Sequence, residues 1–365
     1  MNPDRRPGTA VRDAAEPGEG DRTTLQAETT PAAAAPRRRV RLPAGARSRP
    51  LLIGAGLLAL LALPLIVALA VLAQKRWYPI LDLAMTELRV RDVGSSHPPL
   101  IGLVGRIGPL GRQGSHPGPM SFWLLWPVYR LFGASSWAMQ VSAVALHLVA
   151  MGTALWIAFR RGGVRLMVAL AAVLAILTRA YGAETLTQAW NPYLPLVSFI
   201  VFLLALWSVA DDDLPLLPVA VVAGSLCAQT HVPYLGLTLG LGGFVVVWAL
   251  WTAYRRRKNR AALRRFLVWG AIAAVVAVVL WTPPVIDQIV HTPGNLSVLS
   301  DYFRNPPESP VGLRRAIDVF FVHLNPWHLF EHLVTADRTK VESGSLVPGI
   351  LFLGAWAASA VAAWR

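Results

Sequence analysis

The residues best suited to chemistry follow the first long apolar segment of the chain, between residues 74 and 136. Residues 81 to 90 have the apolar spacing of a short helix lying on a membrane surface. Asp82, Thr86 and Arg89 recur at i, i+4 and i+7 and share one face of that helix. A carboxylate can accept the proton of a hydroxyl nucleophile, and a guanidinium can hold a phosphate. The same spacing is also typical of a surface helix with a weak Asp–Arg pair.

Three other acidic residues are candidates for a second carboxylate. On a regular helix Glu87 points about 140° away from Asp82, so these two cannot act as one pair. Asp92 precedes Gly94, which is also the position of a helix end. Glu184 lies in a later loop, where it could equally satisfy backbone groups at a helix end.

Histidines and arginines accompany the acids in the first loop. His97 and His116 each precede a proline, which favours an extended backbone and projects the ring from a stiff turn. Arg106 and Arg112 lie between them. Outside a membrane these side chains suit a phosphate, or alternatively the headgroups of lipids.

Two polar residues in later loops extend this set. Asn191 follows Trp190, and His231 stands at a turn between two apolar segments, where a polar group is costly unless it has a role. The candidates for binding a phosphate or another polar ligand are therefore Arg89, Arg106, Arg112, His116, Asn191 and His231.

The sequence predicts no metal site, although a divalent cation stays open as a cofactor. His328 and His332 are four residues apart near His323, but His-Leu-Phe-Glu-His is not the zinc pattern His-Glu-x-x-His. Cys227 is the single cysteine, which excludes an intramolecular disulfide and a cysteine metal cluster. The turn around Asn295 shows no chemistry of its own.

The composition is that of a membrane protein. Of 365 residues 55% are hydrophobic and only 15% are charged, whereas soluble domains contain about 25% charged residues. The net charge of +14 is clustered beside apolar segments, which favours an anionic lipid bilayer and not nucleic acid as the partner.

The elements that must position these residues are membrane helices. Length and hydropathy predict eight spans, and an interfacial helix is expected at 119–133. The first span is interpreted as an uncleaved signal anchor, although Ala68-Leu69-Ala70 formally offers a cleavage site. The eight spans are 51–73, 137–159, 164–180, 192–210, 214–230, 232–253, 266–284 and 346–364.

Basic residues orient these spans. A disordered basic tail at 1–50, the turn at 160–165 and the run at 255–265 should all be cytoplasmic, because positive charge is retained inside. Residues 51–365 then form a multi-pass domain in the cell membrane, with a cytoplasmic N-terminus. The turn at His231 falls outside, as do the loops at 74–136, 181–191 and 285–345.

The order of these motifs resembles a known class of enzymes. An acidic residue after the first span, then His116-Pro-Gly-Pro-Met-Ser-Phe-Trp-Leu-Leu and Tyr129-Arg-Leu-Phe-Gly, is similar to the polytopic glycosyltransferases of the GT-C class. The protein mannosyltransferase and aminoarabinose transferase type is most similar, and its His-Pro-Pro-Leu pattern occurs at 97–100. Residues 82–93 and 190–193 resemble an actinobacterial subgroup of uncharacterised membrane proteins. The resemblance covers roughly 51 to 305.

The resemblance implies a GT-C-like all-α helical bundle with an extracytoplasmic active site. It implies a polyprenyl-phosphate sugar as donor and Asp82 as the catalytic residue. Members often have Asp-Glu here, whereas this chain has Asp82-Leu83, so Glu87, Asp92 and Glu184 all stay open as the second acid. Members are commonly longer, which leads us to expect a C-terminal truncation that removes an acceptor-binding part.

The predicted function is transfer of a sugar from a polyprenyl-phosphate donor to a glycan, lipid or protein acceptor, with inversion at the anomeric carbon. The alternative is a transporter or flippase of a lipid-linked sugar, which typically places polar groups at the membrane midplane. In this sequence the acidic residues gather in the outer loops instead. A scaffold in a cell-envelope complex is a third interpretation, but it leaves the loop residues unexplained.

Overall fold

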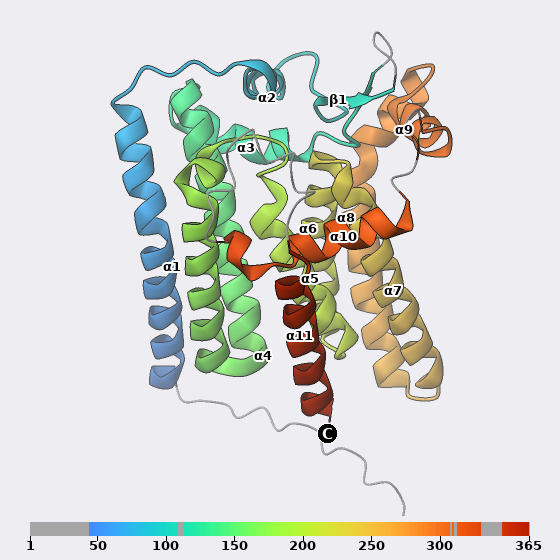
Figure 1. Cartoon of the computed structure of the whole chain (residues 1–365). Coiled ribbons are helices and arrows are strands. Elements are labelled where there is room, and N and C mark those ends of the chain that lie inside the picture. Colours follow the sequence, from blue (N-terminus) through green and yellow to red (C-terminus); the bar gives the residue numbers. More distant parts are fainter. Residues whose placement is uncertain (1–43, 109–112, 307–308, 310–311, 330–344, 365) are drawn as a thin grey trace, which may run out of the picture. The chain divides into compact units, whose positions relative to one another are not determined.

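The computed structural model describes residues 44–108, 113–306, 309, 312–329 and 345–364, and these residues are mainly α-helical (Figure 1). A helix lies at each predicted span position. The helices are α1 (Ala44–Ala73), α2 (Leu81–Asp92), α3 (Met120–Leu131), α4 (Ser136–Thr187), α5 (Pro195–Ala210), α6 (Leu217–Thr230), α7 (Pro233–Arg255), α8 (Arg260–Val290), α9 (Asn295–Arg304), α10 (Leu313–His323) and α11 (Val347–Trp364). Short 3-10 turns occupy Leu214–Leu216 and Pro326–Leu329.

Several helices are suited to a lipid environment. α1, α4, α7 and α8 are long and apolar enough to cross a membrane, and α5, α6 and α11 are shorter apolar helices. α7 and α8 leave large apolar side chains uncovered, including Phe244 and Val278, which are 67% and 69% exposed. Such a surface is unfavourable in water and ordinary in hydrocarbon. The fold is therefore that of an all-α protein with several membrane-spanning helices.

The first helix begins earlier than expected. α1 starts at Ala44, so residues 44–50 are helical and do not belong to a disordered tail. Once a helix is nucleated, adding residues at its end costs little, which explains the extension of the apolar segment into Ala44-Gly-Ala-Arg-Ser. Residues 1–43 of the predicted tail lie outside the described residues.

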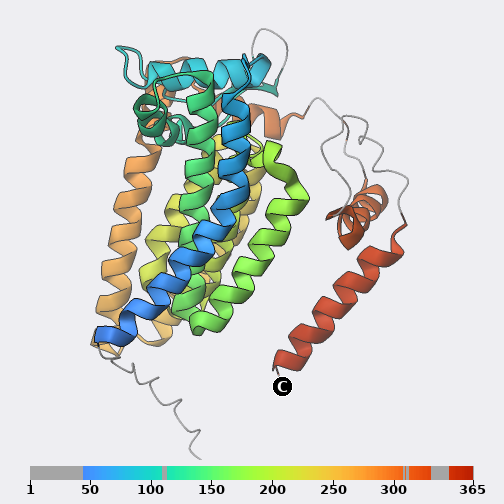
Figure 2. The same cartoon turned by 90° about the vertical axis from the view of Figure 1, so that its left-hand side faces the viewer.

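Helix α4 contains two of the predicted spans in two arms. Gly163 has φ 68° and ψ −159°, a conformation that suits glycine and ends the first arm at 162. The second arm begins at 164 and is itself interrupted at Gly182, which has φ 80° and ψ 159°. The two arms lie side by side in both views (Figures 1 and 2). The predicted basic turn at 160–165 is therefore a real reversal of the chain.

At the end of the helices where α4 reverses, three aspartates join three turns. Arg160 donates two hydrogen bonds of 2.6 Å to Asp213, and Arg256 donates one of 3.0 Å to Asp212. Arg161 is paired with Asp211. The basic turns predicted to share one side of the membrane are thus in contact with one another, through Asp211–Asp213, which sequence analysis gave no role.

The loop at 74–136 forms a layer at the other end, near α9 (Figure 1). The helices expected at 81–90 and 119–133 are present as α2 and α3. Buried Val90, Phe122, Leu125 and Tyr129 pack this layer onto α4, and each such side chain contributes about 1.5–3 kcal/mol.

The loop also holds an antiparallel pair of strands that sequence analysis missed, β1 (Val104–Ile107) and β2 (Gly114–Ser115). The two strands are short and lack an alternating apolar pattern, so no period of two indicates them. Their positions depend on contacts with residues that are distant in the sequence.

Candidate functional site

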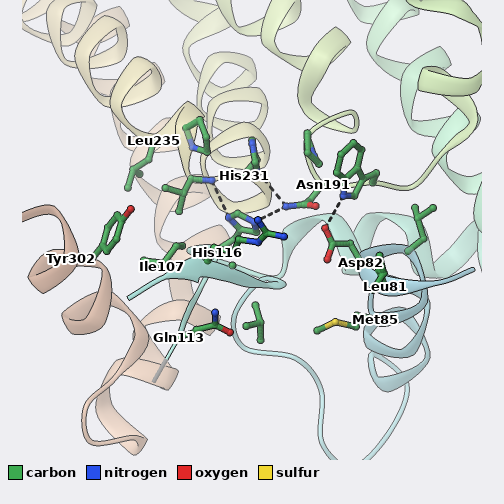
Figure 3. Close-up of a pocket in the computed structure, with 18 of the residues that line it drawn as sticks. Leu81, Asp82, Met85, Ile107, Gln113, His116, Asn191, His231, Leu235 and Tyr302 are labelled. Carbon is green, nitrogen blue, oxygen red and sulfur yellow. Dashed lines mark hydrogen bonds between the residues drawn. The ribbon is translucent and has the colours of Figure 1, made fainter. Parts of the chain in front are cut away.

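A cavity of about 1370 Å³ opens among the predicted outer loops. Its walls come from α2, β1, residues 188–192, the α6–α7 turn and α9. Four loops that were assigned to one side of the membrane from charge alone therefore meet at one cavity. Figure 3 shows the side chains that they contribute.

Asp82 lines this cavity from the first turn of α2. Its Oδ2 accepts a hydrogen bond of 2.9 Å from Trp190 Nε1, and Tyr193 packs edge-on against the Trp190 ring with centroids 4.8 Å apart. No described residue hydrogen-bonds to the other carboxylate oxygen. One oxygen is thus anchored, and the other is free to meet a ligand.

The residue before Asp82 has an unusual backbone. Leu81 has φ 50°, the left-handed region, which is costly for a branched side chain and is concentrated at functional sites. Leu81 also lines the cavity. The strain is therefore located at the start of the helix that carries the carboxylate.

Glu87 does not reach the cavity. It is 3% exposed, and its carboxylate accepts hydrogen bonds from Arg91 Nη2 at 2.5 Å and Ser136 Oγ at 2.8 Å, with the Tyr129 hydroxyl 3.0 Å away. These contacts join α2 to α3 and α4. Glu87 is therefore a structural carboxylate, and its predicted divergence from Asp82 is confirmed.

Replacing Glu87 should lower stability. In Glu87→Gln the neutral amide presents one acceptor oxygen to Arg91, Tyr129 and Ser136, so we expect a loss of about 1–3 kcal/mol. Thermal unfolding of the detergent-solubilised protein should show a lower midpoint. Glu184→Gln, at an exposed position, should unfold like the wild type; an equal loss in both variants would contradict the structural role.

The other acidic candidates also lie outside the cavity. Asp92 is half-exposed and lies 3.7 Å from Arg89. Glu184 is exposed and accepts a hydrogen bond of 2.9 Å from Gln188. Its carboxylate therefore contacts a side chain of the same helix end, and it does not contribute to the cavity wall.

Arg89 is not presented together with Asp82, contrary to the sequence-based expectation. Two turns of helix, about 10 Å, separate the two residues along one face, and Asp92 at i+3 is the nearer carboxylate. Arg106, on β1, does line the cavity. Arg112 lies outside the described residues. His97 is exposed, and its Nδ1 is hydrogen-bonded to the Ser96 hydroxyl at 2.9 Å.

His116, Asn191 and His231 form one cluster in the cavity wall (Figure 3). The Asn191 amide lies 2.5 Å from His116 Nε2 and 3.3 Å from His231 Nδ1. The backbone N–H of Val232 donates to His116 Nδ1 at 3.1 Å. Burial lowers the pKa of His116 to about 4 and also lowers that of His231, so both rings are neutral at pH 7.

The backbone of His116 is fixed by close packing of glycines. Gly102 N–H donates to the His116 carbonyl at 2.9 Å, and a Cβ at Gly102 would lie 2.8 Å from the His116 Cβ. Gly118 N–H donates to the carbonyl of Gln229, and a Cβ at Gly118 would lie 2.3 Å from the Gln229 side chain. The glycine of Pro117-Gly118-Pro119 thus allows this loop to pack closely against α6.

Asn295 is a positioning residue that sequence analysis dismissed as part of a turn. Its side chain accepts from Ser115 N–H at 2.8 Å and donates to the Ser115 carbonyl at 3.1 Å, as a neighbouring strand would. Its own N–H donates to the buried carboxylate of Asp287 at 2.9 Å. No local sequence pattern indicates the contact between Asn295 and Ser115, because 180 residues separate them.

The described residues contain no group of three or more side chains suited to a metal ion. The His323 ring contacts the backbone carbonyl of Val319 in its own helix. The side chain of His328 and the whole of His332 lie outside the described part of the chain.

Comparisons with models of protein families, with curated proteins and with solved structures gave no match.

Proposed function

We propose that this protein is a GT-C-like membrane glycosyltransferase that uses a polyprenyl-phosphate sugar. The observation that carries the proposal is one cavity that combines three chemistries. It holds a carboxylate with a free oxygen at Asp82, a guanidinium at Arg106, and an apolar wall from α7 and α9 that includes Leu235, Leu239 and Phe303. The carboxylate suits a sugar hydroxyl, the guanidinium suits a phosphate, and the apolar wall suits a prenyl chain.

The apolar wall favours a lipid-linked donor over a soluble nucleotide sugar. α7 is one of the helices long and apolar enough to span a membrane, and its first turns line the cavity. A prenyl chain could therefore leave the cavity along α7 without crossing water. We place the cavity at the extracytoplasmic face, with eight spans and a cytoplasmic N-terminus.

The proposed reaction needs one base. The free oxygen of Asp82 takes the proton of an acceptor hydroxyl, the hydroxyl oxygen bonds to the anomeric carbon, and the bond from that carbon to the phosphate oxygen breaks. The electron pair of that bond leaves with polyprenyl phosphate, which needs no protonation to depart. Arg106 stabilises the charge that grows on the phosphate, and the configuration inverts. The acceptor is a glycan, lipid or protein of the cell envelope.

The alternative, transport of a lipid-linked sugar, is favoured by one observation. His147 in α4 is fully buried, and no described residue hydrogen-bonds to its ring. An ionisable group within a membrane helix is commonly functional. Reconstituted protein should nevertheless fail to move a fluorescent lipid-linked sugar between leaflets faster than empty liposomes do, because Asp82 and Arg106 lie in the loop layer.

The experiment that tests the proposal is photo-crosslinking with a diazirine-bearing polyprenyl phosphate. We expect the label on cavity-lining peptides that contain Ile107, Leu239 or Tyr302, and unlabelled polyprenyl phosphate should compete with it. Labelling spread evenly over the apolar helices, without competition, would contradict a donor site in the cavity.

The membrane side of the cavity is a separate prediction. A cysteine at exposed Ser96 should react with an impermeant maleimide from outside intact cells, and one at exposed Asn259, in the α7–α8 turn, should not. Cys227 is buried, so the background should be low. The opposite pattern would place the cavity in the cytoplasm. Asn295 is unsuitable for this test because the structure buries it.

A further inference from the structure

The hydrogen bonds around His116 determine where its proton lies. The backbone N–H of Val232 donates to Nδ1, so Nδ1 must present a lone pair. A neutral imidazole carries one proton, and the buried ring is neutral. The proton of His116 therefore lies on Nε2.

That proton determines the orientation of the Asn191 amide. The atom 2.5 Å from His116 Nε2 must be an acceptor, which is the amide oxygen and not the NH2 group. The two ends of an amide have the same shape and are assigned from their hydrogen bonds. Figure 3 shows the other end of the amide turned toward Asp82, and an NH2 group is favourable beside a carboxylate.

The amide oxygen in turn determines the tautomer of His231. The same amide atom lies 3.3 Å from His231 Nδ1, and an oxygen there can only accept. Nδ1 of the neutral His231 ring therefore carries the proton, and Nε2 is left with a lone pair. His231 lines the cavity, and no described residue donates to this nitrogen.

We infer that His231 is held as a hydrogen-bond acceptor, through Nε2, for a hydroxyl group of the carbohydrate substrate. The inference deepens the proposed function and depends on it for the class of substrate. A phosphate diester has no proton to donate, whereas sugars carry several hydroxyl donors. The phosphate therefore belongs beside Arg106, and the hydroxyl groups belong between His231 and the free oxygen of Asp82.

The surroundings of His231 preserve this acceptor at neutral pH. His116 is 5.0 Å away between ring centroids and is uncharged, and the Tyr234 ring lies 6.3 Å away. Among the described residues, Asp82 and Arg106 are the charged groups that line the same cavity. Protonation would convert Nε2 into a donor, so a hydroxyl could no longer donate to it, and the hydrogen bond in this direction should be lost as pH falls through the lowered pKa of His231.

Nitrogen NMR of the full chain, labelled with ¹⁵N-histidine and held in lipid nanodiscs, tests the tautomer without any activity assay. At pH 7 we expect His231 to carry its proton on Nδ1 and His116 on Nε2. The signals are assigned from those that disappear in His231→Asn and His116→Gln. A proton on His231 Nε2 would overturn the inference.

Two substitutions separate the nitrogens of His231 in a sugar-transfer assay. His231→Asn places an NH2 group near the position of Nδ1 and removes the Nε2 acceptor, so kcat/KM should fall roughly tenfold. His231→Gln can return an oxygen near Nε2 and should recover part of the loss. His323→Asn, outside the cavity, is the matched control and should behave like the wild type. Wild-type kcat/KM in His231→Asn would overturn the inference.

The failure of the proposed function is distinguishable from the failure of this inference. If the wild-type protein transfers sugar from no member of a panel of polyprenyl-phosphate sugars, the proposed function is wrong. The NMR tautomer then still decides whether His231 presents Nε2 as a hydrogen-bond acceptor, and the carbohydrate as its ligand is withdrawn with the proposed function.

Discussion

Asp82→Asn should lower kcat by about 10² to 10⁴ fold, the usual loss when a general base is removed. The asparagine oxygen can still accept the hydrogen bond from Trp190 Nε1, so the side chain should keep its place. The group that is lost is the proton acceptor at the free oxygen. The dissociation constant of the donor, measured by competition in the photo-crosslinking assay, should stay near that of the wild type.

Asp92→Asn is the matched control for this variant. Asp92 lies in the same helix, is half-exposed and does not line the cavity, so its turnover should be unchanged. If Asp92→Asn abolished transfer while Asp82→Asn did not, the base would be assigned to the wrong residue of α2.

Arg106→Ala should lower kcat/KM roughly 10-fold to 100-fold, because a hydrogen bond to a charged group contributes about 1.5–3 kcal/mol. Both KM and kcat should change, since the phosphate is held before the reaction and gains charge during it. Initial rates at varied donor concentration provide the two constants.

Arg89→Ala removes the same chemical group from a surface position and should have little effect. Equal losses in the two arginine variants would indicate a general effect of positive charge near the membrane surface. That result would remove Arg106 from the proposed site.

The sequence predicts the helices of this protein well because their signal is local. Apolar length locates a helix at every predicted span position, and the positions of Arg160 and Arg256 correctly group the turns that meet at one end. The apolar spacing of 81–90 and 119–133 predicts α2 and α3. Each of these predictions needs only residues close together in the chain.

The sequence does not predict the partners of the polar residues, because these come from distant segments. Asp82 is anchored by Trp190, 108 residues away, and Ser115 by Asn295. Helical periodicity places Arg89 on the same face as Asp82, but it does not account for the rise along the helix axis. Because of that rise Arg89 lies nearer to Asp92, with which it forms an ion pair of 3.7 Å. Glu87 is an ordinary acid in sequence, and only the packing of α2 on α3 shows that its carboxylate is structural.

The histidine cluster lies between these two cases. His116, Asn191 and His231 are predicted as candidates from their loops, and the structure brings all three together. Residue type alone leaves both a phosphate and a sugar open as their ligand. The tautomers favour the sugar for His231, and they depend on one backbone N–H, that of Val232.

The most direct test of glycosyl transfer at this cavity is a measurement of sugar transfer by the purified full-length protein in liposomes. The panel consists of radiolabelled polyprenyl-phosphate sugars with an extract of cell-envelope acceptors, and the readouts are labelled acceptor and released polyprenyl phosphate. We predict that at least one donor yields both products in equal amounts with the wild type, and neither above background with Asp82→Asn. Absence of both products with every donor, or equal yields from the wild type and Asp82→Asn, would contradict the proposal.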